Sequence, residues 1–592
     1  MNFDGVSELS DLPETARQPA MAPDTRRPAL HWLALVAILV GIVGGFGAFI
    51  FRILIGFFHN LSFRQSVSGT YDANVHTDAT SPVWLPLVAL PVAALAVTWM
   101  VRNFAPEAKG HGVPEVLDAI YYKGAHIRPI VVLVKALASS ITIGSGGSAG
   151  REGPIVQIGS AFGSLVGGIL GVGRGDRTIL LAAGAGAGIA ATFNAPLGGV
   201  LFAVELFLLR LNARSIGLVA LAVVAASFVG RLLMGPQPSF NVPSLQWPDY
   251  VNEPVYVFLA FATLGVIVGL FSILFIRGVY WAEDLIERIP LNEYIRNALG
   301  MAVVGGLLFA VQARTGHYYV EGVGYATIMD ILNGALSDPL LLLTLAALKL
   351  TATCMTIGFG GSGGIFSPSL VMGGCLGAGV GLLIEAMFPG LGVRVPIFAL
   401  VGMAAMAGAT TGAFFASIVM LTEMSGDSAV VVPVMLGTSV AWLVRQAICK
   451  PSIYNLKLLR RGRNLPESYP SSLLPARTVA DVMVSVPAIR TTAASGIDGT
   501  VITLGGEQRL LGVPDEAGKA AVPGARLCLY AAADPHEDMA SALARATQEG
   551  AEVIVVDTPD SDGRQFVISD AELSADYRRL LGMTSNAPDK TG

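Results

Sequence analysis

The chain has 592 residues, of which 53% are hydrophobic and only 14% are charged, and its mean hydropathy is +0.62. Soluble proteins carry about a quarter charged residues, so the composition excludes a soluble protein and indicates a polytopic protein of the lipid bilayer. The net charge of −5 is small and gives no sign of a nucleic-acid partner. The four cysteines lack metal-ligand spacing, and we expect no bound metal.

The N-terminal segment, residues 1–28, is polar and contains prolines, which is not the pattern of a signal peptide. Arg26 and Arg27 lie just before the first apolar run and favour a cytoplasmic N-terminus. We therefore expect residues 1–28 to form a cytoplasmic tail.

Apolar segments follow one another from residue 32 to residue 444. The first, residues 32–51, contains no charge and is long enough to cross about 30 Å of hydrocarbon. Further predicted spans lie near residues 84–101, 129–143, 195–209, 215–234, 254–276, 296–313, 338–357, 366–387, 397–424 and 429–444. Several are short or interrupted by glycine, which is tolerated where the broken backbone lines a cavity rather than lipid. We predict an all-α transmembrane domain over residues 29–462.

The transmembrane domain contains an internal repeat. Residues 135–163 align without gaps onto residues 349–377, and two further pairs keep the same order. These pairs are 110–120 with 322–332 and 184–205 with 402–423, so that Glu205 is equivalent to Glu423. We expect two similar halves, about 29–236 and 253–462. Matched glycine-interrupted segments in two halves point to the binding site of a transporter.

Three glycine-containing loops each end in proline near the start of an apolar helix: GHGVP (110–114), GREGP (150–154) and GIFSP (364–368). Proline suits a first helical turn, and glycine lets the backbone approach a ligand closely. A helix start presents unpaired N–H groups and the positive end of the helix dipole. Several such starts meeting within the membrane would bind an anion without a full positive charge, weakly enough for it to leave.

Other interpretations of the glycine-rich stretches are weaker. The sequence GSGGSAG before the second loop lacks the lysine and Ser/Thr of a phosphate-binding loop. For Gly184, Gly186 and Gly188 we expect close helix packing rather than dinucleotide binding. The histidines form no HExxH or similar motif, and we do not expect an enzyme.

These motifs resemble the CLC family of chloride channels and proton-coupled chloride transporters. GREGP preceded by GSGG, GIFSP, the GxGxP loop, NAPL (194–197) and KPSIY (450–454) occur in the family's order, and the likeness covers about residues 30–462. The resemblance implies a homodimer in the cell membrane with both termini cytoplasmic. It also implies an inverted repeat of tilted, partly broken helices with one anion pathway in each subunit.

The resemblance also implies roles for individual residues. The backbone amides of Ile365 and Phe366 would bind the central anion, amides around Arg151 and Gly153 would line an outer site, and the Tyr454 hydroxyl would close the inner side. Glu152 matches the family's gating glutamate. An ionised carboxylate at an anion site competes with the anion, and a protonated one loses its charge and can swing away. The alternatives are structural roles: a charge at the helix start for Glu152, and an electrostatic role for Arg151.

Two positions depart from the family pattern. Proton-coupled members often carry a second glutamate where this chain has Leu206, and leucine cannot accept a proton. Coupling could then run from Glu152 through water, with Glu205 as an accessory or as a structural residue. Chloride-preferring members commonly have serine at the position of His111, so His111 and the adjacent Gly112 are candidate anion-binding residues. His111 either donates an N–H to the anion or turns away and leaves the backbone to serve it. The intact GREGP argues against a fluoride-specific protein.

The C-terminal part changes character. A basic and proline-containing linker, residues 463–477, precedes residues 478–592, which we predict to be a small cytoplasmic α/β domain. We expect a helix over 540–548 and strands over 552–557 and 565–569. Parts of this region resemble CBS modules, which implies a degenerate regulatory domain; a dimerisation or stability module is the alternative. A bound nucleotide is not indicated, and no cofactor is expected.

The sequence thus predicts chloride transport across the membrane. The first hypothesis is exchange of chloride for protons through Glu152. The second is a passive, Glu152-gated chloride channel without proton coupling. Because His111 replaces the usual serine, the sequence leaves open whether other monovalent anions are also transported.

Overall fold

The structure is a computed structural model that forms two compact units, residues 1–465 and 466–592, and each is described by itself. The residues that it describes are 29–77, 83–208, 211–240, 242, 254–389, 394–463 and seven strands between 484 and 569.

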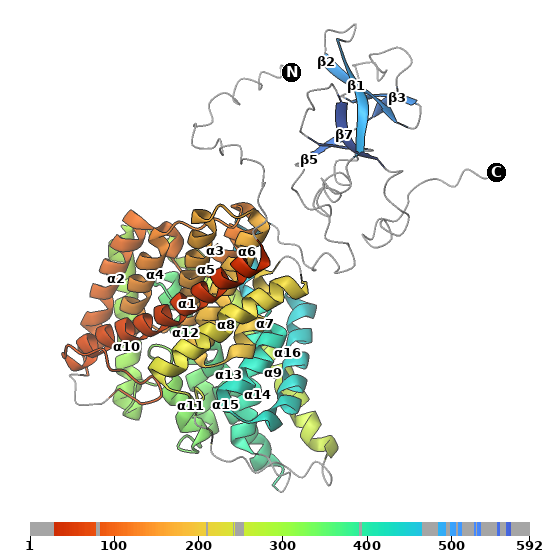
Figure 1. The fold of residues 1–592 in the computed structure, drawn as a ribbon. Coiled ribbons are helices and arrows are strands. Elements are labelled where there is room, and N and C mark those ends of the chain that lie inside the picture. Colours follow the sequence, from red (N-terminus) through yellow and green to blue (C-terminus); the bar gives the residue numbers. More distant parts are fainter. Residues whose placement is uncertain are drawn as a thin grey trace, which may run out of the picture. The chain divides into compact units, whose positions relative to one another are not determined.

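The first unit is helical wherever it is described as regular structure (Figure 1). Its first half contains α1 (Leu30–His59), α2 (Leu85–Phe104), α3 (Val113–Tyr122), α4 (Ile130–Gly144), α5 (Glu152–Ile169), α6 (Arg174–Phe193), α7 (Pro196–Phe207) and α8 (Ala213–Met234). Its second half contains α9 (Pro254–Glu287), α10 (Glu293–Thr315), α11 (Tyr325–Leu332), α12 (Pro339–Gly358), α13 (Phe366–Met387), α14 (Val395–Thr411), α15 (Phe414–Ser425), α16 (Val431–Ile448) and α17 (Ile453–Arg460). Short turns of other helix types are η2 (Asn60–Arg64), η3 (Pro106–Ala108) and η4 (Ser428–Val430).

Within the described part of the chain, 8 helices are long and apolar enough to cross a membrane. The prediction of an all-helical fold with several membrane spans is thereby confirmed for the described residues of this unit. One predicted span, 397–424, is wrong as a single segment: α14 ends at Thr411, and Gly412 with a φ of +82° turns the chain into α15. Five helices were not among the predicted spans: α3, α5, α6, α11 and α17.

Two glutamates show how the halves are related. The Glu205 carboxylate near the end of α7 accepts hydrogen bonds from the amides of Phe415 and Ala416 at the start of α15 (2.8 and 2.9 Å). The Glu423 carboxylate near the end of α15 accepts them from the amides of Leu197 and Gly198 at the start of α7 (3.0 and 2.8 Å). Equivalent helices of the two halves therefore run antiparallel, which is the arrangement of an inverted repeat.

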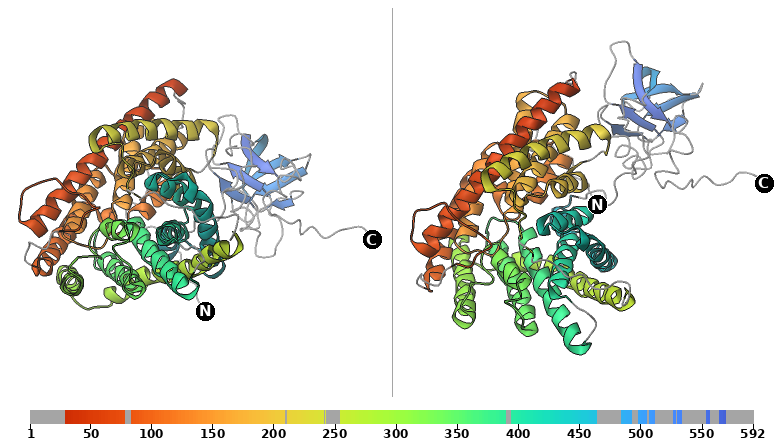
Figure 2. Two further views of the ribbon diagram at one scale, coloured as in Figure 1. Left: turned by 90° about the horizontal axis from the view of Figure 1, so that it is seen from below. Right: turned by 60° about the horizontal axis from the view of Figure 1, so that its bottom comes forward.

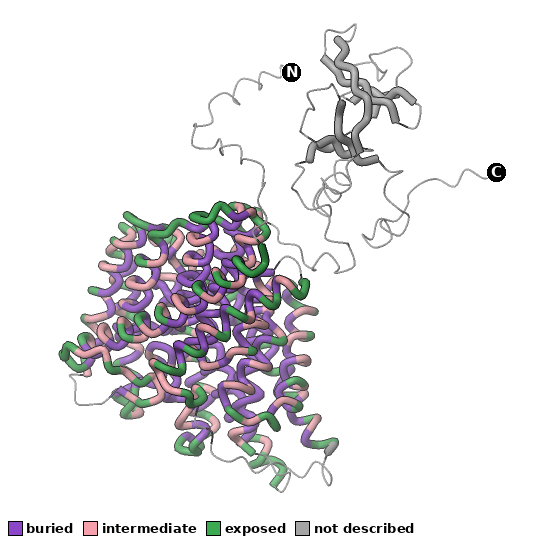
Figure 3. Tube along the Cα trace, viewed as in Figure 1, coloured by how far each residue is buried: buried purple, intermediate pink, exposed green. Residues whose placement is uncertain are grey.

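The interior depends on glycine contacts that the repeat duplicates. A Cβ atom on Gly184 of α6 would overlap the carbonyl oxygen of Gly159 on α5, and the reverse also holds. The equivalent pair in the second half, Gly373 and Gly402, has the same mutual contact between α13 and α14. Close helix packing is thus confirmed for Gly184. Buried residues fill the middle of this unit, and exposed ones lie along its periphery (Figure 3).

Long helices pack around this interior. The first helix, α1, and the last helix of the first half, α8, lie side by side in Figures 1 and 2, where they are red and yellow. The backbone of Ala222 on α8 approaches α1 so closely that only a glycine, Gly41, fits there. Large apolar side chains such as Phe228 and Leu232 on α8 are exposed, as expected of a surface that faces lipid or another apolar partner.

The second unit contains a seven-stranded sheet with the strand order β4-β3-β2-β1-β7-β6-β5. Its strands are β1 (Val484–Thr492), β2 (Asp498–Leu504), β3 (Glu507–Leu511), β4 (Arg526–Cys528), β5 (Tyr530–Ala533), β6 (Val553–Val556) and β7 (Arg564–Ser569). The β3–β4 and β5–β6 pairs are parallel, and the other four pairs are antiparallel. The strands expected over 552–557 and 565–569 correspond to β6 and β7. The expected helix over 540–548 lies outside the described residues.

Candidate functional site

The three predicted loops each lead into a helix. The helix α3 begins at Val113, with Gly112 before it at a φ of +82°, which favours glycine. The helix α5 begins at Glu152 after Arg151. The helix α13 begins at Phe366 after Ile365. The starts expected from glycine and proline are therefore present, and each offers the unpaired amides of a first helical turn.

The same loops meet one another in the interior. Gly150 and Gly364 exchange both backbone hydrogen bonds, with N···O distances of 2.7 and 2.6 Å, as an isolated antiparallel bridge. These two glycines are equivalent in the repeat, so the bridge lies on the local two-fold axis. The first loop joins them because the Gly363 amide donates to the carbonyl of Gly110 (3.3 Å). Three helix starts thus converge on one place.

Two buried lysines hold the loops that precede α3 and α11. The Lys135 ammonium donates to the carbonyls of Ala108 and Gly110 (2.9 and 2.7 Å). Its repeat equivalent, Lys349, donates to three loop carbonyls, of which that of Gly322 is nearest at 2.8 Å. A buried ammonium needs such acceptors. Neither lysine was predicted, although their equivalent positions in the repeat were a usable signal.

The Glu152 carboxylate lies at the start of α13 and is 1% exposed. It accepts a hydrogen bond from the Ser367 amide at 3.2 Å and another from the Ser367 hydroxyl. The hydroxyl of Tyr325, the first residue of α11, lies 3.4 Å from the same carboxylate and 2.7 Å from the Ser367 hydroxyl. A negative group therefore occupies the positive end of a helix that belongs to the other half of the repeat.

His111 and Tyr454 lie next to each other in the interior, with ring centroids 5.9 Å apart, and both are buried. Tyr280 of α9 donates its hydroxyl proton to the carbonyl of Ile453, and its oxygen lies 3.3 Å from Nε2 of His111. Because that proton is already donated, Nε2 of His111 must carry the hydrogen of this contact. Nδ1 is then an acceptor in the neutral ring, and it has no partner among the described residues.

Arg151 and Gly153, the other two predicted residues of this loop, also make close contacts. The Arg151 guanidinium faces the rings of Phe193 and Tyr325, with its carbon 5.7 and 5.3 Å from their centroids, and it donates to the carbonyl of Thr192 (3.3 Å). These contacts match an electrostatic or structural role. A Cβ atom on Gly153 would overlap the carbonyl oxygen of His111, so only glycine allows this approach.

Leu206, which stands where proton-coupled members often have a second glutamate, and its neighbour Glu205 lie near the end of α7. Leu206 is half-buried and packs against the apolar core. Glu205 binds the start of α15, as described above, and its hydrogen bonds are those of a helix cap.

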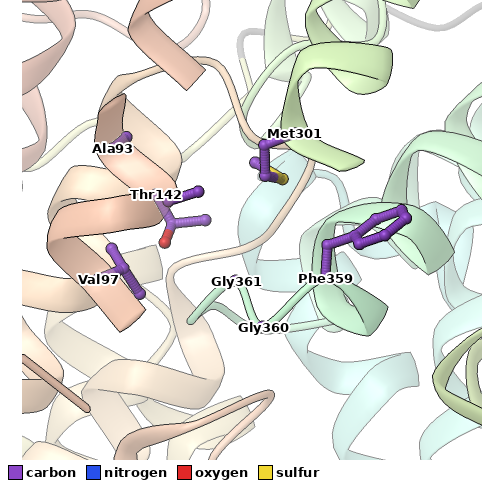
Figure 4. Close-up of a pocket in the computed structure, with 8 residues that line it drawn as sticks. Ala93, Val97, Thr142, Met301, Phe359, Gly360 and Gly361 are labelled. Carbon is purple, nitrogen blue, oxygen red and sulfur yellow. The ribbon is translucent and has the colours of Figure 1, made fainter. Parts of the chain in front are cut away.

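Figure 4 shows a small pocket whose lining does not include Glu152. It is lined by Ala93, Ala94, Val97, Thr142, Met301, Phe359, Gly360 and Gly361. None of these residues is charged. Over the described residues no group of three or more His, Cys, Asp or Glu side chains could hold a metal ion.

Comparison with known proteins gives consistent similarities. The sequence model of the family described as "Voltage gated chloride channel" matches residues 93–446. The H(+)/Cl(-) exchange transporter ClcA of Vibrio cholerae is 30% identical over 79% of this chain and 98% of its own.

Two solved structures share the fold. A slow cyanobacterial Cl-/H+ antiporter has a TM-score of 0.64 and 23% identity, over 74% of this chain and 99% of its own. A eukaryotic CLC transporter has a TM-score of 0.61 and 20% identity, over 92% of this chain and 98% of its own.

Proposed function

Because the chain belongs to the CLC family of voltage gated chloride channels, we propose that it exchanges chloride for protons across the membrane, with Glu152 as gate and proton carrier. The observation that carries the proposal is the Glu152 carboxylate on the amide and hydroxyl of Ser367 at the start of α13. Relatives named as H(+)/Cl(-) exchange transporters at about 30% identity support the same substrates.

The ionised carboxylate occupies the helix end that would otherwise attract an anion. Protonation removes the charge, weakens the hydrogen bonds to Ser367 and frees the helix end for chloride. When the proton leaves, the carboxylate regains its charge and competes with chloride again. Alternate occupation of one site by a carboxylate and an anion links the movement of the proton to that of chloride.

The anion pathway would run past the other converging groups. We assign the central anion to the amides of Ile365 and Phe366, with the Tyr454 hydroxyl on the inner side. Backbone amides near Gly153 would line the outer part. The convergence of the three loops supports this assignment, because it brings several helix starts to one place without a full positive charge.

The assembly and the second unit complete the proposal. We propose a homodimer in the cell membrane with both termini in the cytoplasm, in which exposed apolar residues such as Phe415 face lipid or the second copy. The C-terminal unit would be a regulatory, CBS-like domain, and a dimerisation module is its alternative.

A passive chloride channel is the second candidate, and Leu206 favours it. An apolar side chain at this position offers no inner proton acceptor, so exchange requires water to carry protons between Glu152 and the inner side. The two candidates differ in a single measurable quantity, the proton movement linked to chloride.

Paired flux from liposomes that contain the purified protein tests this choice. A chloride gradient is imposed, and chloride and external pH are recorded together with and without valinomycin. Exchange predicts that chloride drives protons against their own gradient. Chloride flux without linked proton movement would contradict exchange and leave the channel.

Substitution of His111 tests how the ring serves the anion. The neutral ring donates Nε2–H to Tyr280 and offers no N–H at Nδ1, whereas serine would supply a hydroxyl donor. We expect His111→Ser to raise the preference for chloride over nitrate by up to about fivefold, the value reached when chloride alone gains a hydrogen bond of about 1 kcal/mol. Anion competition in the flux assay measures the ratio. An unchanged ratio at every pH would leave His111 as a scaffold residue.

A further inference from the structure

Tyr325 is the first residue of α11 and is 1% exposed. Its hydroxyl lies 2.7 Å from the Ser367 hydroxyl and 3.4 Å from the Glu152 carboxylate. Tyrosine hydroxyls in an interior normally bind a partner, but here the partners are the carboxylate itself and the residue that binds it most closely. Tyr325 was not among the predicted site residues.

The protons of the two hydroxyls can be assigned by counting donors. The Ser367 hydroxyl donates its only proton to Glu152, so its oxygen remains free to accept. The single proton of the Tyr325 hydroxyl can then be donated to that oxygen at 2.7 Å, which is nearer than the carboxylate oxygen at 3.4 Å. The result is a chain from Tyr325 through Ser367 to the carboxylate, in which each hydrogen bond polarises and strengthens the next.

The position of Tyr325 is fixed by its neighbours. Gly324 before it has a φ of +79°, and the Lys349 ammonium binds the carbonyls of the preceding loop. The ring packs edge-to-face against Phe240, with centroids 5.1 Å apart, and lies under the Arg151 guanidinium. These contacts fix the ring and so keep the hydroxyl beside Ser367 and the Glu152 carboxylate.

We propose that Tyr325 is a positioning residue of the gate: through Ser367, its hydroxyl holds the ionised Glu152 carboxylate at the start of α13 and so sets the pH at which the gate is released. This inference rests on the gating role proposed for Glu152. Other charged or titratable groups near the carboxylate are Arg151 on α5, Lys349 on α12 and Tyr454 on α17. Tyr325 differs from them because it completes the hydrogen-bond chain to the carboxylate.

The test is the pH dependence of chloride flux in Tyr325→Phe, which removes one oxygen and keeps the ring. Hydrogen bonds to the charged form favour that form, so their loss makes protonation occur at a higher pH. We expect the midpoint of pH-activated flux to move upward by about one pH unit. Ser367→Ala should move it in the same direction. Tyr318→Phe is the matched control, because that buried hydroxyl binds the carbonyl of Val83 at 3.3 Å, and we expect no shift.

A Glu152→Ala background separates the two proposals. If Glu152 is the gate, Glu152→Ala alone flattens the pH profile, and Tyr325→Phe then adds no further change. A flat Glu152→Ala profile together with an unchanged midpoint in Tyr325→Phe would overturn the role of Tyr325 and leave the gate intact. A wild-type profile in Glu152→Ala would overturn the gate itself. If Tyr325→Phe does not yield folded protein, an unchanged midpoint in Ser367→Ala overturns the inference.

Discussion

Glu152→Gln should abolish proton transport while chloride flux continues and no longer depends on pH. The carboxamide keeps the shape of the side chain but cannot take up or release a proton in this pH range. It also lacks the charge that binds the carboxylate to the start of α13. We expect proton flux to fall by about two orders of magnitude or more, the usual loss when a proton-transfer group is removed.

Paired recording of chloride and pH from liposomes measures both effects in one experiment. Glu385→Gln is the matched control, because Glu385 is an exposed residue near the far end of the same helix, α13, and we expect wild-type fluxes. Unchanged proton flux and unchanged pH dependence in Glu152→Gln would contradict the gating role. Loss of chloride flux together with proton flux would indicate that the carboxylate is needed for the anion path and not only for its gate.

The sequence predicted those features that depend on a few neighbouring residues, such as the starts of helices. Glycine followed by proline marks the start of a helix through the conformations that these two residues allow, so the starts of α3, α5 and α13 were predicted. The inverted relation of the halves could not be derived from the repeat alone, because similarity does not give direction. It required the reciprocal bonds of Glu205 and Glu423.

The side-chain contacts around Glu152 could not be predicted from the sequence. Tyr325 lies on an eight-residue helix that is too short for a clear hydrophobic period, and its partner Ser367 comes from a segment 42 residues later. Two residues so far apart in the sequence are brought together only by the fold, and no short sequence motif indicates that they will be in contact. Arg151 shows the same limit, since its place in the sequence beside Glu152 does not say that its side chain stacks on Phe193.

The two glutamates that cap α7 and α15 are expected to affect stability strongly. Each carboxylate accepts two backbone N–H groups at a helix start, and alanine would leave both donors without a partner in an apolar environment. At about 1–3 kcal/mol for each of the two unsatisfied donors, Glu205→Ala and Glu423→Ala should each cost about 2–6 kcal/mol. Because the halves are equivalent, we expect the two losses to be similar.

Thermal unfolding in detergent, with Glu385→Ala as the control, measures these losses. The caps lie at opposite ends of the α7–α15 pair and share no partner, so the double substitution should add the two single effects. A further variant, Glu205→Gln, tests whether Glu205 is a proton carrier. A cap predicts that Glu205→Gln, which retains an oxygen acceptor, keeps proton-coupled flux in the protein that remains folded. Loss of proton flux at unchanged stability would contradict the cap and make Glu205 the inner acceptor that Leu206 does not provide.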